Sequence, residues 1–160
     1  MNLNHKDINT GSGLGPVKFG MSRETVKKLI GKASEIEHDA FEDEEDSQTE
    51  TWHYDEFNLS LSFDEGFDWR LVSMAVTSDY FEFRNKKLIG LNRADLEKTL
   101  HDLKIADLEY EDLSTPEFPL HELVSSDALG INFWFEDGLL TEIQWTPLLR
   151  DEDDSIIWPK

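Results

Sequence analysis

The chain has 160 residues, no cysteine and a formal net charge of −20, from 35 acidic and 15 basic residues. Disulfides, thiolate metal sites and a cysteine nucleophile are therefore excluded, and so large a negative charge opposes binding to nucleic acid or to an anionic membrane. Hydrophobic residues make up 38% of the chain, including 10 Phe and 5 Trp, which is enough to form a core. The composition predicts a single domain over residues 1–160.

The N-terminal segment has no apolar run of signal-peptide length. No segment approaches the roughly 20 apolar residues that a membrane-spanning helix needs. A cysteine for lipid anchoring is also missing. These features predict a cytoplasmic protein with no membrane partner.

A glycine-rich stretch, residues 11–16, precedes the first predicted helix. It lacks the Lys-Ser/Thr ending of a phosphate-binding loop, and Pro16 removes a backbone donor, so we interpret it as a flexible linker. Ser22 is typical of a helix N-cap, because its hydroxyl accepts a backbone N–H that is otherwise unpaired. A short helix is predicted over residues 23–30, followed by Gly31 at a position that favours the left-handed conformation.

A second predicted helix repeats the motif of the first. The stretch Gly20–Ile30 matches Gly90–Leu100 at the glycine, at the capping position, at the arginine after it and at the apolar positions. Asn92 is the predicted cap, with Asp95 three residues later. The apolar stripe of this helix is Leu96, Leu100 and Leu103.

Each helix is followed by segments with the pattern of a β-hairpin. Residues 59–66 and 131–138 alternate apolar and polar side chains and end in an acidic pair and a glycine, which is typical of a hairpin turn. Return strands are predicted at residues 74–77 and 143–146. The alternation places five aromatic side chains in the core: Trp52, Phe63, Phe133, Phe135 and Trp145.

The order of elements predicts an α+β fold of tandem duplicated helix-plus-antiparallel-hairpin units, with the helices packed on one antiparallel sheet. The first unit would cover about residues 17–79 and the second about residues 87–147. An acidic C-terminal tail would follow at residues 150–160. The two copies diverge at residues 41–50 and 107–119, which are rich in acids.

The sequence carries no recognisable catalytic or metal-binding motif. The histidines are scattered and form no His-x-x-x-His pair, and no Gly-x-Ser-x-Gly element is present. The acidic run at residues 39–50 lacks the central glycine of a calcium-binding loop. Among 35 acidic residues, chance pairs of carboxylates are inevitable, so no single pair is informative about glycoside chemistry. We therefore expect a protein that is not an enzyme and binds no cofactor or metal.

Acidic residues interleaved with aromatic ones are the candidate partner-binding residues. Aromatic anchors dominate interface hot spots, and charge around them speeds the encounter with an oppositely charged partner. Trp69 is included because it lies at a predicted turn, away from the alternating core positions. The candidates are Phe41, Glu42, Asp43, Glu44, Glu45, Asp46, Asp64, Glu65, Phe67, Asp68, Trp69, Tyr80 and Glu82.

The stretch from Gly13 to Gly31, with Phe19-Gly20-Met21-Ser22 at its centre, resembles the opening motif of small bacterial immunity proteins from toxin–immunity loci. It is also similar to the helical motif of the SmpA/BamE outer-membrane assembly family and of β-lactamase inhibitory protein, which is a tandem helix-plus-sheet repeat. The assembly family needs a lipidated cysteine and the inhibitor carries disulfides, so a cysteine-free acidic chain fits an immunity protein better. The resemblance implies neutralisation of a cognate toxin domain, as in contact-dependent growth inhibition, and supplies no catalytic residues.

We therefore expect an immunity protein that binds and neutralises a cognate basic toxin domain, specifically a nuclease, through an acidic surface. Toxins that bind a phosphate backbone are cationic, and an acidic inhibitor is their electrostatic complement. Two alternatives remain open: a cytoplasmic adaptor or binding module that inhibits nothing, and a nucleic-acid mimic that inhibits a DNA-binding protein. No direct nucleic-acid partner is expected.

Overall fold

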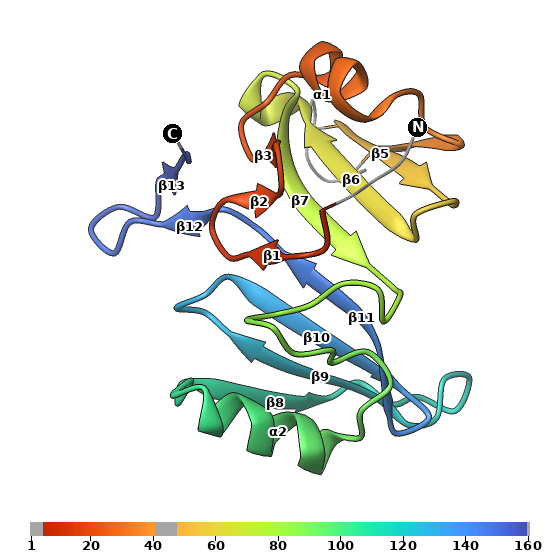
Figure 1. The fold of residues 1–160 in the computed structure, drawn as a ribbon, viewed down its shortest axis with the longest axis vertical. Coiled ribbons are helices and arrows are strands. Elements are labelled where there is room, and N and C mark those ends of the chain that lie inside the picture. Colours follow the sequence, from red (N-terminus) through yellow and green to blue (C-terminus); the bar gives the residue numbers. More distant parts are fainter. Residues whose placement is uncertain (1–4, 41–47, 160) are drawn as a thin grey trace.

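The structure is a computed structural model that describes residues 5–40 and 48–159 (Figure 1). Its framework is an antiparallel sheet of eight strands in the order β4-β5-β6-β7-β11-β10-β9-β8. Strands β4 to β7 are neighbours in the chain and in space, as are β8 to β11, and the two groups meet where β7 pairs with β11. The strands are β4 (Glu35–Ala40), β5 (Gln48–Tyr54), β6 (Leu59–Asp64), β7 (Arg70–Val76), β8 (Leu108–Asp112), β9 (His121–Ser126), β10 (Ile131–Glu136) and β11 (Leu139–Trp145).

Two small sheets and three helical segments complete the described part of the chain. Figure 1 shows α1 and α2 at the two ends of the molecule, with β1 to β3 between them. The small sheets consist of β1 (Ile8–Asn9), β2 (Gly13–Leu14) and β3 (Val17–Lys18), and of β12 (Leu148–Leu149) and β13 (Ile156–Ile157). The helical segments are α1 (Arg23–Ile30), the 3-10 turn η1 (Glu65–Phe67) and α2 (Arg93–Asp102).

The predicted fold class was wrong. The chain is 43% strand and 14% helix, so it is mostly sheet, and one continuous eight-stranded antiparallel sheet with two α-helices in the described residues takes the place of the predicted tandem helix-plus-hairpin units. The pattern of alternation revealed the central hairpins but missed the edge strands. In β8, four of five side chains are exposed, so this strand has no buried face to produce an alternating sequence.

Both α-helices begin at the predicted capping residues. The Ser22 hydroxyl accepts a hydrogen bond from the backbone N–H of Thr25 at 3.2 Å. The Asn92 side chain accepts one from the backbone N–H of Asp95 at 2.8 Å. Gly31 ends α1 with a positive φ of 88°, but its ψ of −168° lies outside the predicted left-handed helical conformation. The helices bury Val26, Ile30, Leu96 and Leu100.

The core lies on one face of the large sheet. In β6, for example, Leu59, Leu61 and Phe63 are at most 2% exposed and alternate with half-buried polar residues. The five aromatic side chains predicted in the core are confirmed, because none is more than 6% exposed. This core face is covered by α1, α2, the β1–β3 sheet and the connection from β7 to α2. That connection contributes Phe81, Phe83 and Leu88 to the core.

The glycine-rich stretch at residues 11–16 is not a flexible linker. Leu14 is fully buried, and so is Val17 in the next strand. Gly13 has a φ of 148°, and a Cβ added there would lie 2.1 Å from the carbonyl oxygen of Val17 and 2.9 Å from Met74 Cε. Glycine is therefore required where β2 and β3 approach each other and the large sheet. The stretch is part of the packed domain.

The segment predicted as an acidic C-terminal tail, residues 150–160, folds back on the domain in its described part. Strands β12 and β13 form an antiparallel pair. Trp158 then packs beside Gly20, where an added Cβ would lie 2.9 Å from the indole ring. The Trp158 ring centre is 6.3 Å from that of Phe67. These contacts attach the C-terminal segment to the turn between β6 and β7.

Candidate functional site

The predicted partner-binding residues fall in three places. Those at residues 41–46, namely Phe41, Glu42, Asp43, Glu44, Glu45 and Asp46, lie outside the described residues. A second set, from Asp64 to Trp69, forms the turn between β6 and β7. Tyr80 and Glu82 lie on the connection from β7 to α2.

The turn from Asp64 to Trp69 is stabilised by internal contacts. The Asp64 carboxylate accepts a hydrogen bond from the backbone N–H of Gly66 at 2.7 Å. Asp68 and Trp69 both have positive φ, at 58° and 57°. Trp69 packs against the core, and the guanidinium carbon of Arg23 lies 4.5 Å from its ring centre. One face of this tryptophan is therefore already occupied by a cation from the same chain.

Tyr80 and Glu82 are not brought close to that turn. Asp64 pairs with Arg70 at one end of β6, whereas Leu59 pairs with Val76 at the other end. Tyr80 lies beyond the second end, in a small hollow that includes Phe57 and Asn58 from the turn before β6. Glu82 is ion-paired with Lys6, with Nζ 3.2 Å from Oε2. The structure thus separates the described residues of the sequence-predicted set, since Tyr80 and Glu82 lie apart from the turn at Asp64–Trp69.

The face of the large sheet opposite the core is left uncovered by the described residues, and we call it the open face. It consists of the strand residues that alternate with the buried ones, and none of those with a described burial is itself buried. Carboxylates are spread over both groups of strands on this face. The acidic residues that the strand registers place there are Glu35, Glu37, Asp64, Glu109, Glu111, Glu136 and Glu142.

Basic side chains are nearly missing from the open face. Among the described strand residues, Arg70 is the only lysine or arginine that the register assigns to it, at the first position of β7 beside Asp64. Two histidines, His53 and His121, also lie on this face, and His53 Nε2 is 3.2 Å from Glu37 Oε1. The guanidinium carbon of Arg70 lies 5.3 Å from the ring centre of Trp158, so this side chain is held at the end of the strand. The open face is consequently a negatively charged surface.

A hollow of 560 Å³ lies on the open face where β7 diverges from β11. It is bordered by Thr77 after β7, His121 on β9, Trp134 and Glu136 on β10, and Thr141 and Glu142 on β11. We call it the Trp134 hollow. Strand β7 pairs with β11 only at residues 143–145, whereas β10 pairs with β11 along residues 139–145. The hollow therefore lies beside Glu142, where β7 no longer pairs with β11.

Hydrogen bonds fix the orientation of Trp134. Its indole N–H donates to Gln144 Oε1 at 3.1 Å, and the Gln144 amide donates in turn to Ser73 Oγ at 3.3 Å. The His121 ring lies beside the indole, with ring centres 5.7 Å apart and planes inclined by 32°. Three neighbouring strands therefore hold one aromatic ring at the hollow.

Glu142 is the cross-strand neighbour of Trp134. Burial raises the pKa of this carboxyl, and the nearby charge of Glu136 raises it further. Among the residues that the structure describes, neither carboxylate forms an ion pair with lysine, arginine or histidine. The hollow therefore combines a fixed indole with partly desolvated negative charge that forms no ion pair with the described residues.

Exposed apolar side chains adjoin the Trp134 hollow. Phe118 is 65% exposed and Leu120 is 57% exposed, both on the loop between β8 and β9. They border a second hollow, of 390 Å³, that shares His121 and Glu136 with the first. Leu120 has a φ of 57°, an unfavourable conformation for this residue, and its carbonyl accepts a hydrogen bond from Asp137 N at 3.0 Å.

Sequence reasoning missed this region. Its candidates came from contiguous acidic and aromatic stretches, and His121, Trp134 and Glu142 are brought together only by strand register. The prediction of aromatic residues in the core concerned Phe133 and Phe135, on either side of Trp134. The same alternation assigns Trp134 to the opposite face of the sheet. This alternation was the one sequence signal that could have identified Trp134 as a residue of the open face.

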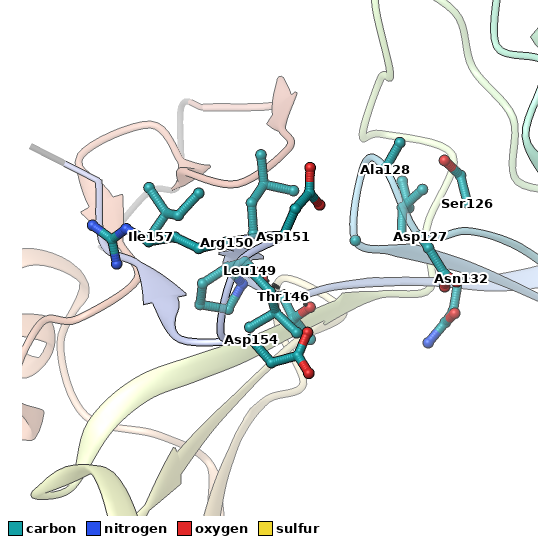
Figure 2. A pocket seen from close by; sticks show the side chains of 14 residues that line it. Ser126, Asp127, Ala128, Asn132, Thr146, Leu149, Arg150, Asp151, Asp154 and Ile157 are labelled. Carbon is teal, nitrogen blue, oxygen red and sulfur yellow. Dashed lines mark hydrogen bonds between the residues drawn. The ribbon is translucent and has the colours of Figure 1, made fainter.

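A larger hollow, of 690 Å³, lies between the β9–β10 turn and the β12–β13 hairpin (Figure 2). Figure 2 shows Asp151 and Asp154 on the hairpin side and Asp127 on the other. These acids are exposed. Arg150 Nη1 donates to Ser155 Oγ and to the Ile156 carbonyl, both at 3.1 Å, so this cation holds the hairpin together. Nothing in this hollow selects a ligand.

The described residues contain no group of three or more His, Cys, Asp or Glu side chains placed to hold a metal ion. Within the same part of the chain, no helix has the length and apolar character needed to cross a membrane. No family model, no curated protein and no solved structure matches the chain.

Proposed function

We propose that the chain is an immunity protein that binds a cationic toxin domain through the open face and thereby neutralises it. The observation that supports this function is the distribution of charge on that face. Carboxylates lie on both groups of strands, while Arg70 is stacked on Trp158 at one strand end. A cationic surface placed opposite a sheet face of this kind would offset the mutual repulsion of its acids.

A nuclease domain is the proposed partner because it carries positive charge where it binds the phosphate backbone. An acidic face that covers such a surface would compete with the nucleic-acid substrate for the same cations. The resemblance of the Gly13–Gly31 stretch to immunity proteins agrees with this role. The exposed Phe118 and Leu120 and the half-buried Trp134 would supply the apolar contacts that give an interface its affinity.

The direct test is coexpression with the toxin domain encoded beside this gene. The chain should restore growth, and the purified proteins should associate at physiological salt, more weakly as salt increases. Absence of both rescue and association would contradict the proposal.

A matched pair of variants locates the interface. The double change Glu109→Lys and Glu111→Lys reverses two charges on the open face. The control, Glu24→Lys and Asp102→Lys, makes the same change in net charge on the helices that cover the core. The first variant should lose affinity by about tenfold or more, whereas the control should stay within about threefold of the unmodified chain. Equal losses would show that net charge, and not the open face, determines binding.

A further inference from the structure

We propose that the Trp134 hollow receives one arginine side chain of the partner, with the guanidinium between the indole ring and the carboxylates of Glu136 and Glu142. This inference rests on the proposed function, because it names the partner group that the open face recognises. It concerns residues on β10 and β11 that form no part of the sequence-predicted site.

The geometry favours a planar ligand group. Trp134 is fixed through Gln144 and Ser73, so its ring presents a constant surface and loses little conformational entropy on binding. Glu142 lies directly across the strand pair from it. A guanidinium stacked on the indole can also donate two parallel hydrogen bonds to a carboxylate, which an ammonium group cannot do.

Charge favours a cation over any neutral group. Glu136 and Glu142 have no basic partner among the described residues, and Glu142 is half-buried. A partly desolvated carboxylate without a counter-charge destabilises the free protein, and a partner's cation removes that cost. An isolated metal ion is a poorer candidate, because the described side chains include no set of three placed to coordinate one.

The surroundings also suggest what lies beside the arginine. Phe118 and Leu120 border the adjoining hollow, next to Glu136. An apolar side chain next to the arginine in the partner would cover them while the guanidinium enters the Trp134 hollow. The segment of the partner that binds here would therefore carry an arginine and, beside it, an apolar side chain.

The test uses the full chain and a small probe, N-acetylarginine amide, followed by the indole N–H signals in ¹H–¹⁵N NMR spectra. The Trp134 signal is assigned by its loss in Trp134→Phe. The arginine probe should shift this signal saturably at constant ionic strength. The lysine analogue should act more weakly, and the neutral citrulline analogue should be weaker by about tenfold or more.

Two glutamine variants separate binding from folding. Glu142→Gln should reduce the response to the arginine probe by about tenfold while the protein melts at the same or a higher temperature. Glu111→Gln removes an exposed carboxylate elsewhere on the open face and should leave the response within about twofold. No shift of the Trp134 signal, an equal response to citrulline, or an unchanged response in Glu142→Gln would overturn the proposal.

This experiment also distinguishes the two proposals. If the toxin domain binds the open face but the arginine probe leaves Trp134 unaffected, the arginine site is wrong and the proposed function stands. If the probe binds as expected but the toxin domain does not bind, the site stands and the immunity function falls.

Discussion

Arg23 Nη1 donates a hydrogen bond to Glu50 Oε2 at 3.0 Å, which ties the first residue of α1 to β5. Glu50 is only 7% exposed, and its other carboxylate oxygen accepts from the Trp52 indole at 2.6 Å. A related contact exists at α2, where Arg93 Nη1 lies 3.2 Å from Glu122 Oε2. Each helix is thus fixed to the sheet by the arginine that follows its N-cap.

Arg23→Ala should lower the free energy of unfolding by about 2 kcal/mol, because it leaves the buried Glu50 carboxylate with the Trp52 hydrogen bond and, among the described residues, only the exposed His38 ring beside it, 3.6 Å from Oε2. Arg93→Ala should cost about 0.5 kcal/mol, since the Glu122 side chain is more exposed, at 16% against 9% for Glu50. Urea denaturation of both variants measures the difference. Equal losses of unfolding free energy in the two variants would show that the Arg23–Glu50 contact stabilises the fold no more than the Arg93–Glu122 contact does.

Gly13→Ala should prevent folding or destabilise the domain by at least about 3 kcal/mol, because its Cβ would meet the Val17 carbonyl oxygen at 2.1 Å. Gly90→Ala is the matched control. Gly90 also has positive φ, at 99°, but an added Cβ would meet nothing within 4 Å. This control should cost about 1 kcal/mol. Comparable thermal melting of the two variants would show that the β2–β3 contact does not require glycine.

Local signals made part of the fold predictable. Ser22 and Asn92 act on backbone groups three residues away, so their capping roles can be recognised in the sequence. The alternation of residues 59–63 likewise reflects one buried face of a single strand. These predictions needed no knowledge of distant partners.

Other features depend on pairing between distant segments. Strand β8 is acidic and exposed along most of its length, so only its partner β9 shows that it is a strand. The Trp134 hollow also needs the irregular register between β10 and β11 at Trp134 and Phe135. That irregularity sets which residues of β11 lie opposite Trp134, and no local sequence pattern specifies it.

Glu142→Gln should stabilise the protein near neutral pH and have little effect near pH 4. In the folded chain, burial and the charge of Glu136 raise the pKa of Glu142 above its ordinary value of 4.5. Stability therefore falls as the pH rises from the unfolded pKa through the folded one, because the unfolded chain ionises first. Glu136 and His121 are the titratable groups bordering Glu142 in the hollow.

Denaturation curves for the unmodified chain and for Glu142→Gln between pH 4 and pH 8 measure this effect. The stability gain of the variant should grow with pH and then level off above the folded pKa of Glu142. Glu136→Gln in the unmodified background should give part of the same gain, since it removes the repelling charge. A variant that loses stability at neutral pH would indicate that the Glu142 carboxylate stabilises the sheet.

Asp107→Ala should destabilise the chain by about 1 kcal/mol at neutral pH, through the turn between β9 and β10. The Asp107 carboxylate accepts hydrogen bonds from Ser126 Oγ at 2.8 Å and from Ala128 N at 3.0 Å. These bonds lower the pKa of Asp107 below 3.8. Its contribution is therefore complete above about pH 5 and decreases as the pH falls through the folded pKa. A destabilisation that persists unchanged at pH 2.5 would contradict this origin.

Leu120→Gly should keep or increase stability while weakening the complex with the toxin domain. The backbone at Leu120 has a φ of 57°, which glycine adopts without strain, and the side chain is 57% exposed, so little core packing is lost. The gain from relieved strain, up to about 1 kcal/mol, is opposed by the greater flexibility of glycine in the unfolded chain.

If Leu120 contacts the partner, the variant should bind several-fold more weakly with an unchanged or higher melting temperature. Asn85→Gly is the control, because Asn85 has a similar φ of 67° but lies on the connection from β7 to α2, which covers the core face and not the open face. Unchanged binding by Leu120→Gly would exclude this loop from the interface.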